Sequence, residues 1–195
     1  QNADVFVEVS GLVKAAAVNL AKIAGDLRIL SAGPRGGLAE ISLPQLQAGS
    51  SIMPNKVNPV IPEMVSQVSF QVICCDQAIT LAAFSGQLEL NAFLPLITFN
   101  LLWELKLLNT CVTLFRTRCV ERIQANPERC TRSLEESLCL APSLVPYIVY
   151  ENAAELSREA ATQSKTIRQA VIEKGLFTQE ELDIIFSPSE LTRPG

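Results

Sequence analysis

One short segment concentrates the side chains that could do chemistry. The loop of residues 49–59 reads Gly-Ser-Ser-Ile-Met-Pro-Asn-Lys-Val-Asn-Pro and offers two adjacent hydroxyls, one ammonium group and one carboxamide. With Lys56 as the cation, Asn58 as the amide donor, and the hydroxyls and backbone N–H groups as further donors, this set suits an anionic small molecule rich in carboxylates. Composition alone leaves a second interpretation open, in which the segment is a solvated Gly/Ser/Pro connector.

The absence of histidine narrows the chemistry further. No Ser-His-Asp or Cys-His arrangement can be built from this chain. Ser50 or Ser51 could therefore act only if its alkoxide were stabilised by Lys56, by a helix terminus or by N–H groups of the loop. The six cysteines form no C-x-x-C pair, so we expect free thiols, no metal site and no cofactor.

Long helices must position this loop. Apolar residues recur at helical spacing from Asp4 to Leu30, which predicts a helix that ends at Ala32-Gly33-Pro34. The segment from Gly33 to Pro62 holds four glycines and five prolines and has no periodicity, as is typical of a functional loop.

Two further long helices follow the loop. One is predicted to have Pro62 and Glu63 in its first turn and to run through Met64–Ala83. The next is predicted from Leu90 to about Ile123, with a kink at Pro95. These helices are apolar on most sides, so other helices must surround them in a larger bundle.

The composition of the chain changes near residue 126. Beyond this residue, charged side chains are more frequent and the predicted helices are shorter. Helices are predicted at Glu128–Cys139, Pro146–Thr162, Ile167–Glu173 and Thr178–Phe186, with a capping box from Thr178 to Glu181 and Gly175 after the third helix. No β-pattern is visible. The prediction is an all-α protein, with residues 1–126 forming part of a long-helix bundle that carries the 49–59 loop and residues 127–195 forming a small helical C-terminal domain.

Composition excludes several classes of partner. The net charge of −4 gives no electrostatic reason to expect nucleic acid or an anionic membrane surface. The longest uncharged stretches, Ile41–Asn55 and Leu90–Trp103, are interrupted by proline and asparagine and fall short of the ~20 apolar residues that span a bilayer. The N-terminus lacks a signal-peptide pattern, which predicts a cytoplasmic protein. The helical pattern begins within a few residues of Gln1, as expected for a chain cut from something longer.

The 49–59 loop closely resembles the signature G-S-S-x-M-P-x-K-x-N-P of the fumarase/aspartase superfamily. Similar segments flank it: Ser31-Ala32-Gly33-Pro34-Arg35-Gly36-Gly37-Leu38-Ala39-Glu40-Ile41 before the loop, Gly86-Gln87-Leu88-Glu89-Leu90-Asn91 after it, and the tail around Leu176–Ile185. The run Lys56-Val57-Asn58-Pro59-Val60-Ile61 is closer to aspartate ammonia-lyases, since fumarases tend to carry Thr-Gln after that Asn-Pro.

The resemblance implies an anti elimination of ammonia from L-aspartate to give fumarate, in a homotetramer with composite active sites. By motif position, Ser50 is the general base, acting as its alkoxide. Ser51 and the backbone of Ile52 and Met53 would hold the distal carboxylate of the dicarboxylate substrate. Lys56 and Asn58 would bind a substrate carboxylate and steady the loop.

Two departures from the family pattern stand out. Asn55 occupies a position where many relatives have glycine, and asparagine tolerates left-handed geometry better than most residues. The family's other two active-site segments, one of which carries a histidine, lie upstream of this loop and are absent. The chain is therefore expected to be a C-terminal fragment that carries one of three site segments and is inactive alone. Two alternatives stay open: a fumarate hydratase of the class II type, and a non-catalytic helical scaffold of the same fold.

Overall fold

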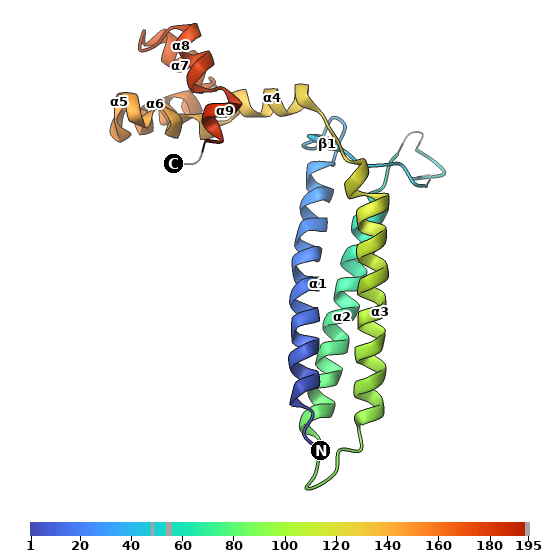
Figure 1. Ribbon diagram of the computed structural model, residues 1–195. Helices are drawn as coiled ribbons and strands as arrows, with labels where there is room; N and C mark the ends of the chain where they lie inside the picture. Colours follow the sequence, from blue (N-terminus) through green and yellow to red (C-terminus); the bar gives the residue numbers. More distant parts are fainter. Residues whose placement is uncertain (48, 54–55, 194–195) are drawn as a thin grey trace. The chain divides into compact units, whose positions relative to one another are not determined.

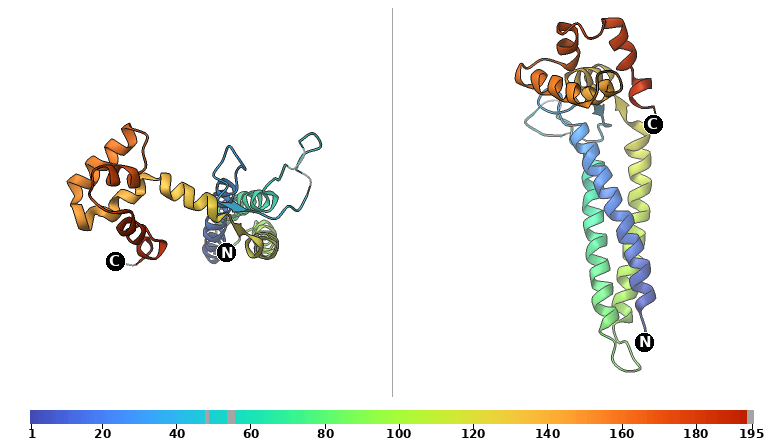
Figure 2. Two further views of the ribbon diagram at one scale, coloured as in Figure 1. Left: turned by 90° about the horizontal axis from the view of Figure 1, so that it is seen from above. Right: turned by 90° about the vertical axis from the view of Figure 1, so that its left-hand side faces the viewer.

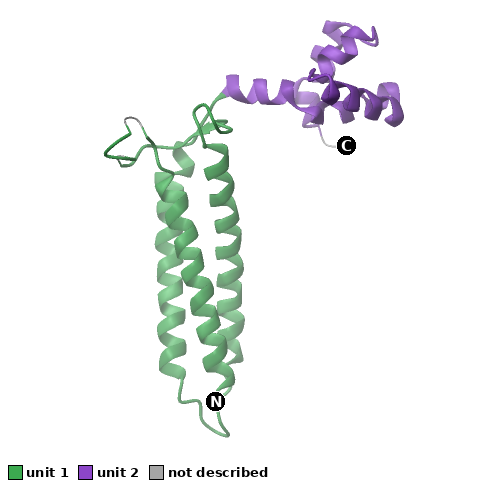
Figure 3. Ribbon diagram, turned by 180° about the vertical axis from the view of Figure 1, so that it is seen from behind, with its two compact units in different colours: residues 1–126 green, residues 127–195 purple. Residues whose placement is uncertain are grey.

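A computed structural model describes residues 1–47, 49–53 and 56–193. The structure divides into two compact units, Gln1–Asn126 and Pro127–Gly195 (Figure 3). Each unit has its own buried core, so each is described by itself.

Three long helices form the body of the first unit in the described part of the chain. They are α1 (Asp4–Leu30), α2 (Val60–Phe84) and α3 (Leu94–Arg118), and they lie side by side with α2 antiparallel to both α1 and α3 (Figures 1 and 2). The bounds of α1 confirm the predicted helix. The 49–59 loop belongs to the connection between α1 and α2, at one end of the bundle.

The ends of α2 and α3 differ from the prediction. α2 begins at Val60, so Pro62 is its third residue, where a missing N–H removes no intrahelical bond. α3 begins at Leu94 and ends at Arg118, not at Leu90 and Ile123. Pro95 therefore lies in the first turn of α3, where proline is tolerated, and the predicted kink was wrong. A short 3-10 helix, η1 (Val120–Arg122), follows α3.

The core of the bundle lies along the seam between the three helices. Near the loop it contains Ala24, Val65, Cys111, Phe115 and Cys119, and at the opposite end Ala3, Ile79, Ala82 and Ile97. The outward faces keep large apolar side chains exposed, among them Leu12, Phe70, Phe99 and Leu102. Exposed apolar area on this scale is typical of a surface that other helices cover.

The helix α2 is long and apolar enough to cross a bilayer by length and composition alone. Its buried positions recur every three or four residues and face α1 and α3, and they include Ser69 and Asp76. This pattern fits the core helix of a bundle. All six cysteines are free thiols; Cys75, Cys111 and Cys119 are buried, whereas Cys74, Cys130 and Cys139 are exposed.

A small antiparallel pairing that the sequence did not predict joins the segment between α1 and the 49–59 loop to the segment that follows η1. Strand β1 (Ile41–Ser42) pairs with β2 (Gln124–Ala125), with Ile41 opposite Ala125. Two-residue strands are too short to leave an alternating pattern, and their partners lie far apart in the sequence. The Asn126 N–H also donates to the Glu40 carbonyl at 2.8 Å, which extends the pairing at its Ile41–Ala125 end.

The second unit is a small helical domain. Its elements are α4 (Pro127–Glu136), the 3-10 helix η2 (Leu138–Leu144), α5 (Val145–Ile148), α6 (Tyr150–Thr162), α7 (Ile167–Glu173), α8 (Gln179–Ile185) and α9 (Pro188–Leu191). Its core is formed by residues from η2, α6, α7 and α8, including Leu140, Leu144, Leu156, Ile167, Val171 and Leu182.

Local signals in this unit are partly confirmed. The capping box from Thr178 to Glu181 is present, and Thr166 and Gln169 form a second one. Gly175 follows α7 with φ +63°, a conformation that glycine adopts at little cost. The predicted helix Pro146–Thr162 is instead two helices, because Val149 takes φ +59° and interrupts it.

Candidate functional site

The 49–59 loop is closed at its base by backbone contact. A Cβ added to Gly49 would lie 2.0 Å from the carbonyl oxygen of Lys56, a separation that no side chain can occupy. The Asn58 carboxamide donates to the Gly49 carbonyl oxygen at 3.1 Å, and the Asn58 carbonyl accepts from the Val60 N–H at 2.9 Å. These contacts tie the loop to the start of α2.

Ser50 lies just inside this closure and is half-buried. Its Oγ accepts two backbone hydrogen bonds, from the N–H of Ile52 and from the N–H of Met53, each at 3.1 Å. Two donors directed at one hydroxyl oxygen favour its deprotonated form, because they stabilise negative charge on that oxygen. Of the three stabilising groups that the sequence allowed for a serine alkoxide, the structure supplies the N–H groups of the loop.

The other predicted site residues are placed at the tip and the base of the loop. Ser51, Ile52 and Met53 are exposed, with Ile52 88% and Met53 53% exposed. The backbone N–H groups expected to hold a substrate carboxylate are the same two that donate to Ser50 Oγ in this structure. That carboxylate-binding role stays a prediction.

Lys56 contributes its backbone to the loop rather than its ammonium group. Its N–H donates to the Met53 carbonyl at 3.4 Å, while its side chain is exposed and makes no ion pair with any residue that the structure describes. The structure thus brings Ser50 together with Ile52 and Met53, and Gly49 with Lys56 and Asn58. The Lys56 ammonium is exposed to solvent. Ala48, Pro54 and Asn55 lie outside the described residues, so the substitution at position 55 is not placed.

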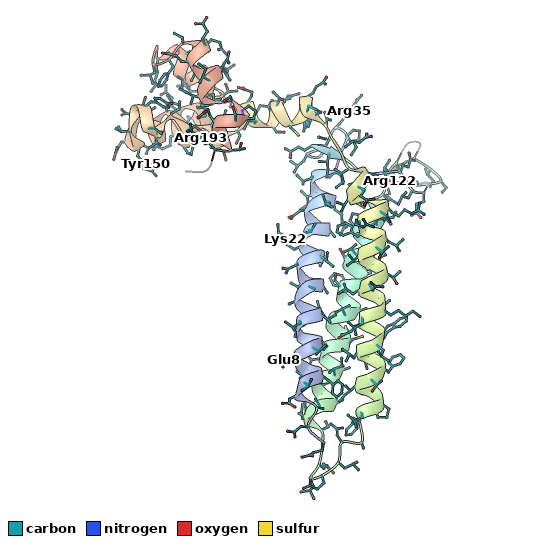
Figure 4. All side chains as sticks on the ribbon, in the orientation of Figure 1. Glu8, Lys22, Arg35, Arg122, Tyr150 and Arg193 are labelled. Atoms are coloured by element: carbon teal, nitrogen blue, oxygen red, sulfur yellow. The ribbon has the colours of Figure 1, made fainter. Side chains whose placement is uncertain are left out.

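A polar hollow of about 700 Å³ lies beside the segment that leads into the loop. It is lined by Ser42, Leu43, Pro44, Gln45, Glu121, Arg122, Ile123 and Gln124. Arg122 stands at the loop end of the bundle (Figure 4). Sequence analysis did not single out this arginine, because the β1–β2 pairing that brings it beside the loop segment left no pattern.

Metal binding finds no support within 1–47, 49–53 and 56–193. In these ranges no group of three or more His, Cys, Asp or Glu side chains is arranged to hold a metal ion. The 49–59 loop itself offers a serine oxygen with two N–H donors, an exposed ammonium group, and backbone held in a closed turn.

Comparisons with known proteins identify the family. Residues 1–74 match the family described as Lyase, and residues 140–193 match the family described as the Fumarase C C-terminus. The chain is 45% identical over all its 195 residues to an aspartate ammonia-lyase of Bacillus subtilis, and 45% identical over 190 residues to one of Escherichia coli.

Solved structures show the same similarity in three dimensions. A fumarate lyase:delta crystallin from Brucella melitensis superposes with a TM-score of 0.89 at 50% identity and covers 97% of this chain. A class II fumarase from Schistosoma mansoni superposes with a TM-score of 0.90 at 37% identity and covers 98% of this chain. The chain spans about two fifths of the length of these proteins: 41% and 40% of the two curated relatives, and 41% and 40% of the two structures.

Proposed function

This chain belongs to the fumarase/aspartase superfamily, and from that premise we propose that the whole protein is an aspartate ammonia-lyase, which eliminates ammonia from L-aspartate to give fumarate. The observation that carries this proposal is the pair of N–H donors on Ser50 Oγ. A serine oxygen becomes a general base when fixed dipoles stabilise its alkoxide, and two N–H groups of the loop donate to this oxygen.

The proposed reaction begins with removal of a proton from the carbon beside the distal carboxylate of aspartate. The Ser50 alkoxide takes this proton, and the electron pair of the broken C–H bond moves into the carboxylate to give an enediolate dianion. The electrons then return to form the C=C bond, and the C–N bond breaks with its electron pair leaving on ammonia. Fumarate, ammonia and a protonated Ser50 hydroxyl result, so atoms and charges balance.

The largest barrier in this scheme is the second negative charge on the distal carboxylate. Preorganised donors stabilise such charge most effectively when water is excluded. Ser51, Ile52 and Met53 are exposed. In the proposed scheme Ser50 loses its negative charge when it takes the proton, and the N–H groups of Ile52 and Met53 that donate to its Oγ would then turn to the distal carboxylate, together with Ser51. Lys56 and Asn58 would bind a substrate carboxylate, with Asn58 also holding the base of the loop.

The remaining site groups must come from elsewhere. We propose a homotetramer in which three subunits contribute segments to each active site, with this chain supplying the 49–59 loop. The apolar outer faces of α1, α2 and α3 support this arrangement, because they need helices from other segments or subunits to cover them. Alone, the 195-residue chain is expected to be inactive. The protein is proposed to be cytoplasmic and to use no cofactor.

Fumarate hydratase is the second candidate, since the C-terminal unit matches the Fumarase C C-terminus and the fold superposes on a class II fumarase. Aspartate is favoured because identity to the aspartate ammonia-lyases, 44–48%, exceeds the 37% to that fumarase. The Val60-Ile61 pair after Asn58-Pro59 also favours aspartate, because fumarases tend to carry Thr-Gln at these two positions.

The deciding experiment uses the longest reading frame that contains this chain, referred to below as the full-length protein. It is assayed with L-aspartate and with L-malate by the absorbance of fumarate. Activity on L-aspartate alone supports the proposal. Activity on L-malate alone would show that the protein is a fumarate hydratase instead. A folded full-length protein inert on both substrates would leave the non-catalytic scaffold as the better description.

A further inference from the structure

A buried polar cluster links the three long helices within the bundle, away from the 49–59 loop. It consists of Ser10 and Lys14 on α1, Asp76 on α2 and Glu104 on α3, and is called here the α1–α3 polar cluster. Ser10 and Glu104 are fully buried and Asp76 is 4% exposed. Charged side chains are almost never buried to this degree unless they are paired. The ion pairs and hydrogen bonds within the cluster therefore decide which of its carboxyl groups are ionised.

One cation serves two carboxylates. The Lys14 ammonium contacts Asp76 Oδ2 at 2.6 Å, and its own side chain is 42% exposed. Asp76 Oδ1, both carboxylate oxygens of Glu104 and Ser10 Oγ make no hydrogen bond with any residue that the structure describes. With both acids ionised, the cluster carries a net charge of −1 inside an apolar seam.

The groups that face Glu104 come from both neighbouring helices. Ser10 and Lys14 face it from α1, and Asp76 and Cys75 face it from α2. Burial, the largest cause, and the charge of Asp76 together raise the pKa of Glu104 to about 7, against the opposing effects of Ser10 and Lys14. Protonation of Glu104 would leave one Lys14–Asp76 ion pair, a net charge of zero, and a carboxyl O–H as a new donor among the unpaired oxygens.

We propose that Glu104 is a pH-sensitive element of the bundle, which is protonated in the most stable form of the fold and loosens the packing of α1, α2 and α3 when it ionises. The geometry carries this assignment: one cation, two buried carboxylates and several unpartnered acceptor atoms on three different helices. The cluster lies outside the residues proposed for catalysis, so its titration acts on stability and assembly rather than on the chemical step.

The sign of the pH dependence follows from linkage. The folded state binds the Glu104 proton more tightly than the unfolded state, whose carboxyl titrates at its ordinary value near 4.3. Stability contributed by this proton is fully present below that ordinary value and is lost as pH rises through the folded pKa of about 7. The bundle is therefore expected to become less stable as pH rises from weakly acidic to weakly basic.

The test compares urea unfolding of the full-length protein and of its Glu104→Gln variant between about pH 5 and about pH 8.5. A Gln carboxamide is neutral at every pH and retains a donor, so it imitates the protonated acid. The unfolding midpoint of the unaltered protein should fall across this range, and the Glu104→Gln variant should lose most of that fall and exceed the unaltered protein above neutral pH. Glu8→Gln, which removes an exposed carboxylate from α1 (Figure 4), should keep the original pH dependence.

Infrared spectroscopy of the unaltered protein gives an independent measurement if Glu104→Gln does not fold. A protonated buried carboxyl has a carbonyl band that ionised carboxylates lack, and this band should be present near pH 6 and be lost as pH rises through the folded pKa of about 7. The proposal is overturned if no such band is present, or if Glu104→Gln and Glu8→Gln show the same pH dependence of the midpoint.

Discussion

The carboxamide of Asn58 donates a hydrogen bond to the carbonyl oxygen of Gly49 across 3.1 Å and joins the two ends of the 49–59 loop. At the same closure, Gly49 lies against the carbonyl of Lys56 with no room for a Cβ. The closed base of the loop thus fixes the position of the Ser50 backbone. The N–H groups of Ile52 and Met53 donate to Ser50 Oγ. The position of Ser50, the proposed general base, is therefore set by contacts within the loop and not by contacts with substrate.

Replacing Gly49 with alanine should open this closure. The added Cβ would overlap the Lys56 carbonyl oxygen, so the backbone must move by more than an ångström. Misplacement of that size costs on the order of a hundredfold in rate, and we expect kcat of the full-length Gly49→Ala protein to fall by about that factor. Steady-state kinetics on L-aspartate measure it, and faster hydrogen exchange at Ile52 and Met53 should accompany the loss. An unchanged kcat would show that the closed loop base is not needed for the reaction.

Replacing Ser50 with alanine should remove the proposed base and leave the fold intact. General-base catalysis contributes about 10²–10⁴-fold, and kcat of the full-length Ser50→Ala protein should fall by at least that much with its oligomeric state unchanged. Ser85→Ala is a matched control, because Ser85 follows α2 at the other end of the bundle and its hydroxyl donates only to the Leu81 carbonyl. Full activity of Ser50→Ala would remove the serine from the mechanism.

Much of the framework could be predicted because its signals are local. Apolar spacing from Asp4 to Leu30, ended by Gly33-Pro34, fixed the bounds of α1. The Thr178-to-Glu181 spacing predicted a capping box that the structure contains. The family followed from the loop motif and its flanking segments, since several fixed residue types at fixed spacing rarely coincide by chance.

Other features depend on contacts that side-chain patterns do not record. The β1–β2 pairing joins residues far apart in the sequence through backbone groups only. The two donors to Ser50 Oγ are also backbone groups, so only the folded loop shows which of three stabilising arrangements exists. The break at Val149 had no signal, because neither valine nor the following tyrosine is a turn residue.

Arg168 should be the main polar contributor to the stability of the second unit. Its guanidinium binds both carboxylate oxygens of Glu135 on α4 at 2.9 and 3.0 Å, contacts Asp183 on α8 at 2.6 Å and lies 5.4 Å from the ring centre of Phe186. Lysine cannot make these contacts together, so Arg168→Lys should lower the free energy of unfolding by about 1–2 kcal/mol.

The matched control for Arg168 is Arg132→Lys. Arg132 makes one exposed ion pair with Glu136 on the same helix, and exposed pairs of this kind contribute little. Urea unfolding of both variants should show a clear loss for Arg168→Lys and almost none for Arg132→Lys. Equal losses would mean that the three-element contact contributes no more than a surface pair.

Val149 should be the most favourable single position for stabilising the second unit. Its backbone has φ +59° and ψ 163°, a region that β-branched residues essentially never adopt and that glycine enters freely. The conformation is imposed from both sides, because the Val149 N–H donates to the Val145 carbonyl and the Val149 carbonyl accepts from the Ala153 N–H. The side chain is 58% exposed, so its removal sacrifices little buried area.

Val149→Gly should therefore raise the free energy of unfolding by about 1 kcal/mol, the released strain exceeding the entropic cost of glycine in the unfolded chain. Val149→Ala separates strain from side-chain size, because alanine keeps the Cβ that makes a positive φ unfavourable and should give little or no gain. Thermal or urea unfolding of the three proteins provides the comparison. If Val149→Gly lost stability while Val149→Ala kept it, the entropic cost of glycine would exceed any strain released at Val149, and the prediction would be wrong.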